Sequence, residues 1–248
     1  MGFEGKHVVV TGAGSGVGAA VVKAASDAGA RTWGLDVNPD AEGVVSGNGG
    51  TFLQCDVSDA ASWHHVADKI DTIDHLHLNA GIQAAPPEAP LEEYRFDHMD
   101  LERYRRMMGV NVDGVVLGLH YLLPKMQPGG SILVTGSLAG IVPYDVDPLY
   151  SMSKHAVTGL VRSLAREMAS RDLRINALCP GGIDTGIIPH EQRTDQAVFM
   201  TAAHVASEAL RLLEVPDNGE TWAKVAESKP AWIMVPPGRK RDKNNQNN

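Results

Sequence analysis

A tyrosine and a lysine lie one helical turn apart in Tyr150-Ser-Met-Ser-Lys154, and Ser137 lies upstream of them. Apolar residues recur at helical period through Met168, which predicts a helix over residues 150–169. On a helix, positions i and i+4 share a face, so the phenol of Tyr150 and the ammonium of Lys154 are expected to project together. The three side chains predict a proton-transfer site at the start of a helix.

The chemistry of such a site depends on the pKa of the tyrosine. A phenol has a reference pKa of about 10, roughly three units too high near neutral pH, which corresponds to about 4 kcal/mol. One positive charge at about 4 Å, in an effective dielectric near 20, supplies about the same free energy. We therefore expect Lys154 to activate Tyr150 and the Ser137 hydroxyl to bind the substrate oxygen. The alternative is an ordinary helix start with an exposed lysine and a packed tyrosine.

A glycine-rich turn follows the first apolar segment of the chain. His7–Thr11 is typical of a buried strand, and it leads into Gly12-Ala-Gly-Ser15-Gly16-Val17-Gly18 and a helical pattern through Ala28. The order of strand, glycine turn and helix predicts a phosphate site, because backbone N–H groups and the helix dipole favour a pyrophosphate there. A tight turn without a ligand is the alternative.

The next predicted strand, Arg31–Asp36, ends in an acid. In a dinucleotide-binding fold this position accepts hydrogen bonds from a ribose 2′-hydroxyl, and a carboxylate there repels a 2′-phosphate. Val37, Asn38 and Ser15 offer no cation to bind such a phosphate. The pattern favours NAD over NADP. The alternative is an acid at the strand end that is solvated and contacts no cofactor.

Strand-like and helix-like segments alternate along the rest of the chain. We expect strands at 51–55, 73–78, 131–135 and 174–179, with a last one near 219–225. Ser58 is expected to cap a helix to Ile70, and a long helical region carrying Asn111 is expected from near 91 to near 128. The pattern predicts one α/β domain over residues 1–237, a Rossmann-type doubly wound parallel sheet of about seven strands with helices on both faces.

Composition excludes several classes of protein. The chain has 248 residues, 43% hydrophobic, and its net charge of −8 argues against nucleic acid or an anionic membrane as a partner. Two cysteines, Cys55 and Cys179, form no disulfide framework and no zinc-like spacing. No secretory segment or membrane-spanning run is found, so a cytoplasmic protein is expected. Residues 238–248 are polar and are expected to be disordered.

Taken together, these residues resemble the short-chain dehydrogenase/reductases, specifically an NAD-preferring member of the standard-length branch. The resemblance spans residues 6–185 in the family's order. The matching cofactor positions are Gly12, Ser15, Gly16, Val17, Gly18, Asp36, Asp56, Val57, Asn79, Ala80, Gly81, Tyr150, Lys154, Pro180, Gly181, Ile183 and Thr185.

The resemblance implies a role for each catalytic position. Tyr150 would be the general acid/base, Ser137 would orient the substrate oxygen, and Lys154 would lower the tyrosine pKa and hold the nicotinamide ribose. Asn111 would complete a water-linked proton relay. The implied reaction passes a hydride between NAD and a secondary alcohol or ketone without a metal, in a homotetramer or else a dimer.

The chain departs from the family pattern at its C-terminal end. Ala226-Glu-Ser228 stands where many members have Asp-Gly-Gly, and an extra apolar segment follows at 230–235. We expect Trp232 and Met234 to pack across a subunit boundary or to close the substrate cleft. Packing on the chain's own core is the alternative.

The predicted substrate pocket is biased toward apolar side chains. No lysine or arginine other than Arg193 lies in its loops, which argues against a phosphorylated or coenzyme A substrate and favours a hydrophobic or cyclic alcohol. Residues 186–200 are expected to form a lid. The expected lining residues are Gln83, Leu138, Val142, Tyr144, Gly182, Ile187 and Ile188.

Two other hypotheses about the function remain open. One is a dinucleotide-binding sensor or scaffold without catalysis, although a sensor would not need the acid/base group. The other is a lyase or epimerase on the same fold that uses NAD transiently.

Overall fold

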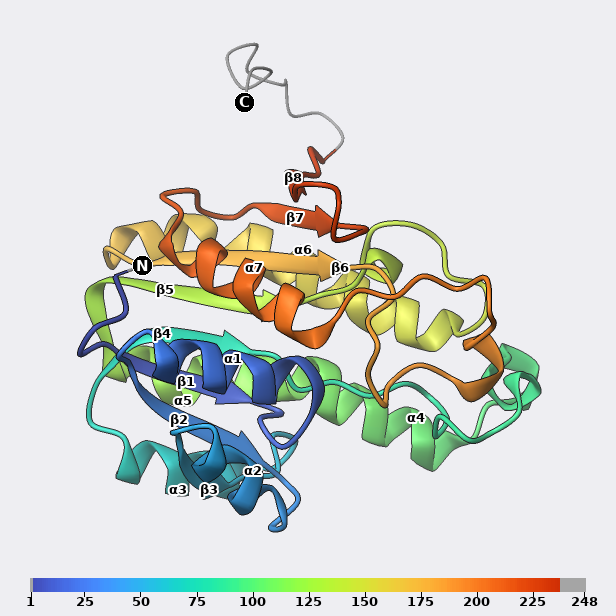
Figure 1. Cartoon of the computed structure of the whole chain (residues 1–248), viewed down its shortest axis with the longest axis horizontal. Coiled ribbons are helices and arrows are strands. Elements are labelled where there is room, and N and C mark those ends of the chain that lie inside the picture. Colours follow the sequence, from blue (N-terminus) through green and yellow to red (C-terminus); the bar gives the residue numbers. More distant parts are fainter. Residues whose placement is uncertain (1, 237–248) are drawn as a thin grey trace.

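The structure is a computed structural model that describes residues 2–236. It contains one eight-stranded sheet in the order β3-β2-β1-β4-β5-β6-β7-β8 (Figure 1). The strands are β1 (His7–Thr11), β2 (Arg31–Asp36), β3 (Thr51–Gln54), β4 (Ile73–Leu78), β5 (Met126–Thr135), β6 (Arg174–Pro180), β7 (Thr221–Lys224) and β8 (Trp232–Ile233). All pairs are parallel except β7 with β8. The predicted doubly wound sheet is confirmed, with one strand more than expected. The predicted tail at 238–248 lies outside the described residues.

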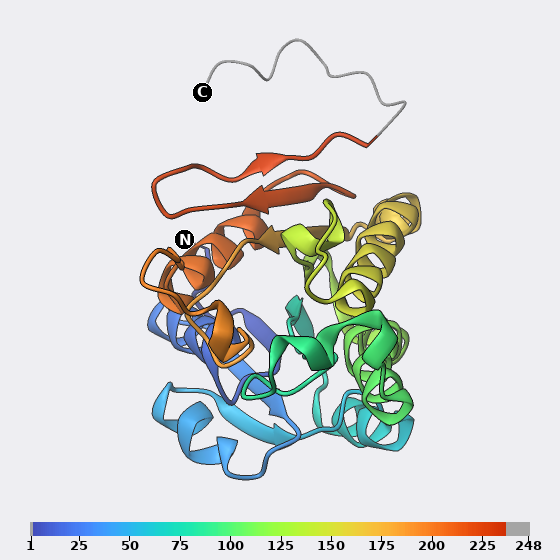
Figure 2. The same ribbon diagram turned by 90° about the vertical axis from the view of Figure 1, so that its right-hand side faces the viewer.

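Helices cover both faces of the sheet. They are α1 (Gly16–Asp27), α2 (Ala41–Gly47), α3 (Ala60–Lys69), α4 (Leu101–Met108), α5 (Gly114–Leu122), α6 (Pro148–Ser170) and α7 (Ala202–Glu214). Figure 2 shows α1, α2 and α7 on one side of the strands and α3 to α6 on the other. The sequence reading did not identify α2 or α7.

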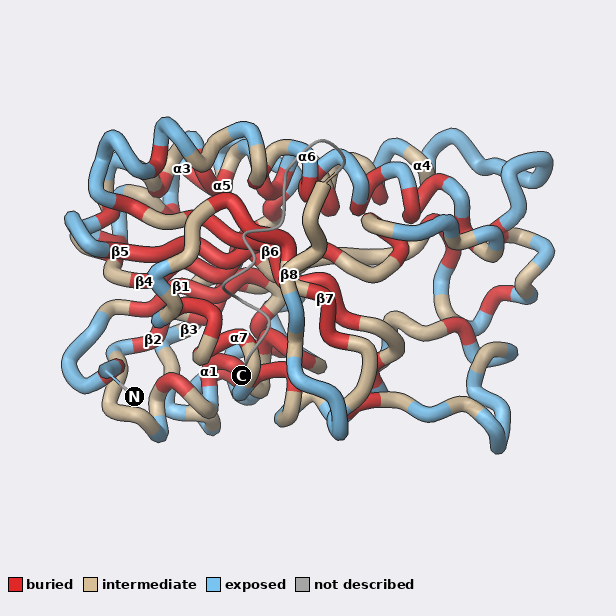
Figure 3. Tube along the Cα trace, turned by 90° about the horizontal axis from the view of Figure 1, so that it is seen from above, coloured by how far each residue is buried: buried red, intermediate tan, exposed pale blue. Residues whose placement is uncertain are grey.

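Alternating side chains of the strands form a separate core on each face. Val8 and Val10 of β1 pack with α1 and α7, whereas Val9 packs with α3, α5 and α6. The same alternation separates Leu133 of β5 from its neighbours Ile132 and Val134. The strands are therefore buried on both faces, as a parallel sheet requires, and Figure 3 shows the buried residues concentrated along them.

Three predicted element boundaries were wrong. Helix α3 begins later than expected because Asp59, not Ser58, caps it by accepting a hydrogen bond from Ser62 N at 2.8 Å. The expected long helix from near 91 is broken by extended backbone at Arg95 and starts as α4 after the cap Asp100. Strand β5 begins at Met126, before Gly129, because Met126 pairs with Ile73 ahead of a bulge.

The C-terminal apolar segment extends the chain's own sheet. In β8, Ile233 pairs with Trp222 of β7, and Met234 N donates to Thr221 O at 2.8 Å. Trp232 stays 39% exposed, and its indole donates to Met234 Sδ. Neither Trp232 nor Met234 lines the cavity described below, so the structure does not support cleft closure by these side chains. Packing across a subunit boundary remains a prediction.

Within residues 2–236, no helix is both long and apolar enough to span a membrane.

Candidate active site

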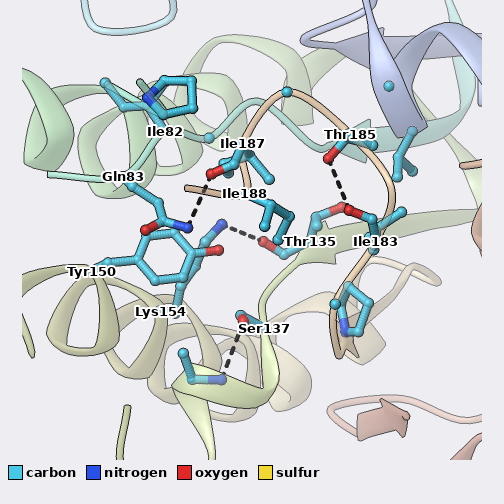
Figure 4. A pocket seen from close by; sticks show the side chains of 18 of the residues that line it. Ile82, Gln83, Thr135, Ser137, Tyr150, Lys154, Ile183, Thr185, Ile187 and Ile188 are labelled. Carbon is cyan, nitrogen blue, oxygen red and sulfur yellow. Dashed lines mark hydrogen bonds between the residues drawn. The ribbon is translucent and has the colours of Figure 1, made fainter. Parts of the chain in front are cut away.

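A cavity of about 820 Å³ opens at the carboxyl ends of the central strands. The strand order reverses between β1 and β4, and such a switch point leaves a crevice where doubly wound sheets bind ligands. We call its two parts the glycine end (Gly12, Ser15, Gly16, Val17, Asn79 and Gly81) and the isoleucine end (Ile82, Gln83, Ile187 and Ile188). Figure 4 shows side chains that line it, among them Gln83, Tyr150 and Lys154.

The turn at the glycine end depends on backbone contacts. Gly12 and Gly16 have positive φ angles of 65° and 51°. A Cβ on Gly12 would stand 2.9 Å from Ala80 Cα, and one on Gly18 would stand 2.0 Å from Gly12 O. Gly12 and Gly16 line the cavity, whereas Gly18 lies behind them and lets α1 approach the turn. The turn is thus closed to any larger residue at Gly18.

The glycine end fits the pyrophosphate of a dinucleotide. Helix α1 begins there with Ser15 as N-cap, whose side chain makes no capping bond, and no acidic residue lies in the first turn. Its free backbone N–H groups and dipole favour an anion. Ser15, Val17, Pro180, Gly181, Ile183 and Thr185 line the same cavity.

The positions expected to hold the adenosine lie outside this cavity. The Asp36 carboxylate, at the end of β2, accepts hydrogen bonds from Gly14 N at 2.8 Å and Asn38 N at 3.0 Å. Asp56 accepts from Ser58, and the carbonyl of Val57 accepts from the Trp63 indole at 2.8 Å. Asp36 is joined to the glycine turn, and the adenosine contacts of all three residues remain predictions.

A hydrogen-bonded network ties the ends of β1, β4 and β5 together beneath the cavity. Thr11 Oγ1 accepts from the backbone N–H groups of Asn79 at 2.8 Å and Ala80 at 3.0 Å. Thr135 Oγ1 donates to Asn79 Oδ1 at 3.1 Å and lies 2.8 Å from His77 Nε2. Because the threonine proton goes to Asn79, His77 Nε2 must donate, which leaves Nδ1 without a proton. Burial favours this neutral form and lowers the pKa of His77 to about 3.

Asp147, which was not predicted from the sequence, fixes the start of α6, the helix that carries Tyr150 and Lys154. Its fully buried carboxylate accepts from Tyr150 N and from Ala84 N, each at 2.9 Å. It is therefore both the N-cap of α6 and a link to the loop at the isoleucine end. The Asp-Pro pair ahead of the helical pattern was the available signal, because a cap followed by proline is typical of a helix start.

Tyr150, Lys154 and Ser137 all line the cavity between its two ends. Tyr150 packs with Ile82 and Ile187, and Lys154 Nζ lies 5.6 Å from the centroid of the tyrosine ring. Lys154 Nζ also donates to Thr135 O at 2.9 Å. The structure therefore brings together the tyrosine, lysine and serine that the sequence singled out.

Lys154 was expected to lower the pKa of Tyr150, and burial outweighs that effect. Burial raises the pKa of Tyr150 well above its usual range, and hydrogen bonding with the Ser137 side chain offsets only part of that rise. Burial also lowers the pKa of Lys154 to about 8. The predicted lowering of the Tyr150 pKa was wrong because the cost of burying the charged groups outweighs the attraction between them.

Asn111 lies in a π-helical turn, Gly109–Asp113, between α4 and α5. Its Oδ1 accepts from Ile82 N at 2.8 Å, and its Nδ2 donates to Ile82 O at 2.9 Å and Ser153 Oγ at 3.0 Å. The side chain is buried and does not line the cavity. In this structure Asn111 holds the backbone at the isoleucine end, and its relay role remains a prediction.

The predicted lid contributes Ile187 and Ile188 to the isoleucine end and is hydrogen-bonded to neighbouring loops. Gln83 Nε2 donates to Ile187 O at 3.1 Å, His190 N to Pro87 O at 2.7 Å, and Tyr144 Oη to Gln192 Oε1 at 2.9 Å. Gln83 Oε1 is buried without a partner among the described residues, which leaves one acceptor for a ligand.

Six of the seven predicted substrate positions line the cavity. They are Gln83, Leu138, Tyr144, Gly182, Ile187 and Ile188. Val142 does not line it and is 48% exposed, so that prediction was wrong. Its loop turns outward after the short helical turn Leu138–Gly140, which a loop assignment from sequence cannot resolve.

Two arginines of α4 reach the cavity. Arg103 and Arg106 are part of its lining, whereas Arg193, the cation expected from the loops, is not and instead pairs with Asp184 at 2.7 Å. Neither arginine was predicted from the sequence, because both lie on a helix that borders the cavity and not in the loops after the strands. Their i, i+3 spacing was the available signal, since it places both on one helix face.

Within residues 2–236, no three His, Cys, Asp or Glu side chains group as metal ligands would.

Comparison with known proteins identifies the family. The family model described as short chain dehydrogenase matches residues 6–196, and the chain belongs to this family. It is 36% identical over 213 residues to 2,5-dichloro-2,5-cyclohexadiene-1,4-diol dehydrogenase of Sphingobium indicum, covering 82% of this chain and 83% of the relative. It is 34% identical over 197 residues to cis-4-hydroxycyclohexanecarboxylate dehydrogenase of Sinomonas cyclohexanicum, covering 75% and 76%.

Solved structures show the same fold. BdcA in complex with NADPH matches with a TM-score of 0.80 at 25% identity, covering 91% of this chain and 95% of that one. A 3-ketoacyl-(acyl-carrier-protein) reductase from Brucella melitensis complexed with NADH matches with a TM-score of 0.76 at 25% identity, covering 90% and 97%. One of these similar structures holds NADPH and the other holds NADH. The comparison therefore supports a nicotinamide dinucleotide as the cofactor and does not distinguish NAD from NADP.

Proposed function

We propose that this protein is an NAD-dependent dehydrogenase of cyclic secondary alcohols that also reduces the matching ketones. The observation that carries the proposal is the position of Tyr150, between a glycine turn suited to a pyrophosphate and an apolar wall of isoleucines. Both dehydrogenases compared above are named for six-membered ring alcohols, which supports a ring as the substrate.

Asp36 supports NAD as the cofactor. Its carboxylate is joined to the glycine turn through Gly14 N, where the adenosine ribose of a dinucleotide would lie. The next residues along the chain, Val37 and Asn38, carry no positive charge for a 2′-phosphate. Exclusion of NADP by charge repulsion is the expected result.

Each residue then has a defined part in alcohol oxidation. The bound nicotinamide supplies the hydride acceptor for the carbinol carbon. Tyr150 Oη takes the hydroxyl proton, and Ser137 Oγ donates a hydrogen bond to the substrate oxygen. Lys154, held by Thr135 O, places its positive charge beside the tyrosine and stabilises the phenolate form of Tyr150, which accepts this proton and becomes the phenol. In ketone reduction the same groups act in reverse.

A panel assay tests the proposal. Purified protein is mixed with NAD or NADP and with cyclohexanol, borneol, a cyclohexadiene diol, 4-hydroxycyclohexanecarboxylate or a linear secondary alcohol, and formation of reduced nicotinamide is followed by absorbance. We expect turnover with NAD and ring alcohols. If the protein binds NAD but turns over none of the alcohols, the result favours a sensor. If the substrate changes only when NAD is present and no reduced cofactor accumulates, the result favours a lyase or epimerase.

A homotetramer, or else a dimer, and a cytoplasmic location remain part of the proposal. Sedimentation measurements on the full chain and on a chain ending at residue 228 test the first point. A change in oligomer size would support packing of the removed segment, residues 229–248, across a subunit boundary.

A further inference from the structure

The cavity is positively charged in a protein that is acidic as a whole. Arg103, Arg106 and Lys154 line it, and among the described residues of its lining none is Asp or Glu. The whole chain has 30 acidic against 22 basic residues. A cleft lined by one sign of charge concentrates ligands of the opposite sign. The lining therefore favours an anionic ligand.

The positive charges differ in how far they are already neutralised. Arg103 pairs with Glu93, which raises the pKa of the guanidinium. Lys154 Nζ already donates a hydrogen bond to Thr135 O, beside Tyr150. The side chain of Arg106 makes no ion pair or hydrogen bond within residues 2–236, so its five N–H donors remain available to a ligand. A free guanidinium matches a carboxylate, which it can bind through two parallel hydrogen bonds.

Helix α4 places Arg106 on the side of the proposed substrate. Met107, the next residue, packs with Ala84 and Tyr150, and Ile82 and Ile187 join the same cluster. This helix therefore borders the isoleucine end, whereas the pyrophosphate position lies at the start of α1. On the basis of the proposed function, we propose that Arg106, assisted by Arg103, binds a carboxylate carried on the ring alcohol away from its hydroxyl.

Paired substrates of nearly equal shape test this assignment. The ratio of kcat/KM for 4-hydroxycyclohexanecarboxylate to that for 4-hydroxycyclohexanecarboxamide is measured in the wild-type protein and in Arg106→Gln. A charge-assisted contact at an exposed arginine on the cavity lining predicts a preference of about tenfold for the carboxylate, lost in the variant. Arg105→Gln is the matched control, because Arg105 is exposed on the same helix and does not line the cavity. A wild-type ratio near one, or an equal change in both variants, overturns the inference.

A binding measurement separates this inference from the proposed function. Calorimetry with NAD-saturated wild-type protein and Arg106→Gln gives the dissociation constants of cyclohexanecarboxylate and cyclohexanecarboxamide. We expect about tenfold weaker binding of the carboxylate alone in the variant. This result supports the inference even if no alcohol is turned over. Turnover of neutral ring alcohols without any preference for the carboxylate overturns the inference and leaves the proposed function intact. Weaker NAD binding in the variant, with an unchanged carboxylate-to-carboxamide ratio, assigns Arg106 to the cofactor and overturns the inference.

Discussion

The two ends of the cavity are built by different kinds of interaction. At the glycine end, backbone groups pack closely against one another. Gly12 O leaves no room for a Cβ at Gly18, and Thr11 Oγ1 accepts hydrogen bonds from the backbone N–H groups of Asn79 and Ala80. At the isoleucine end, side chains from three distant segments meet, and Gln83, Tyr144 and Asp147 join them. The shape of the glycine end is thus set by the backbone, whereas the shape of the isoleucine end depends on the side chains that line it.

Tyr150 stands where the two ends meet, so its hydroxyl should have the largest single effect. In Tyr150→Phe we expect turnover to fall by about 10²–10⁴-fold with NAD binding retained, because only proton transfer is lost. Steady-state rates and NAD titration by fluorescence measure the two properties. Tyr121→Phe is the control, since it removes a phenol from α5 away from the cavity. A Tyr150→Phe rate close to that of Tyr121→Phe would contradict the assigned role.

Gly18 and Gly186 test the contrast between the two ends directly. A Cβ at Gly18 meets Gly12 O at 2.0 Å, whereas a Cβ at Gly186 has nothing within 4 Å. We expect Gly18→Ala to reduce the free energy of unfolding by about 3 kcal/mol, and Gly186→Ala by less than about 0.5 kcal/mol. Chemical denaturation measures both. Equal losses would show that the glycine end is no more tightly packed than the isoleucine end.

The neutral histidine beneath the glycine end predicts how stability depends on pH. His77 in the unfolded chain protonates near pH 6.5, while its pKa in the folded protein is lowered to about 3. Its stabilising contribution is therefore complete above pH 6.5. It falls below that pH by about 1.4 kcal/mol per pH unit, because only the unfolded state takes up the proton.

His75 adds to this effect, since burial lowers its pKa to about 4. Denaturation curves between pH 7.5 and 5 should show the loss, and His77→Val should show a shallower slope than His65→Gln, which changes an exposed side chain. Identical slopes in the two variants would remove His77 from the explanation.

Asp36, which lies outside the cavity and binds the glycine turn through Gly14 N, carries the smallest predicted effect. In Asp36→Ala we expect the preference for NAD over NADP to fall about tenfold, as the repulsion of a 2′-phosphate disappears. Asp40→Ala serves as the control because Asp40 is exposed and makes no side-chain capping bond. The ratio of kcat/KM values for the two cofactors measures the change, and an unchanged ratio would exclude Asp36 from cofactor selection.

The same contrast explains what could be predicted from the sequence. The βα alternation and the motifs around Gly12, Asn79 and Tyr150 predicted the fold and the glycine end, because their spacing is set by local backbone geometry. Arg103 and Arg106 were missed because their place in the cavity depends on how α4 crosses the ends of the strands. Val142 was misplaced for the same reason, since nothing in its own sequence shows which way its loop turns. The pKa of Tyr150 was misjudged because burial is a property of the folded chain.

The central claim is that Tyr150 exchanges a proton with an alcohol held beside a nicotinamide. A crystal structure of the protein with NAD and 4-hydroxycyclohexanecarboxylate tests it most directly. The account predicts the alcohol oxygen within hydrogen-bond distance of both Tyr150 Oη and Ser137 Oγ, with its carbinol carbon facing the nicotinamide ring. An alcohol oxygen bound away from Tyr150, or a nicotinamide ring outside the cavity, would contradict the account.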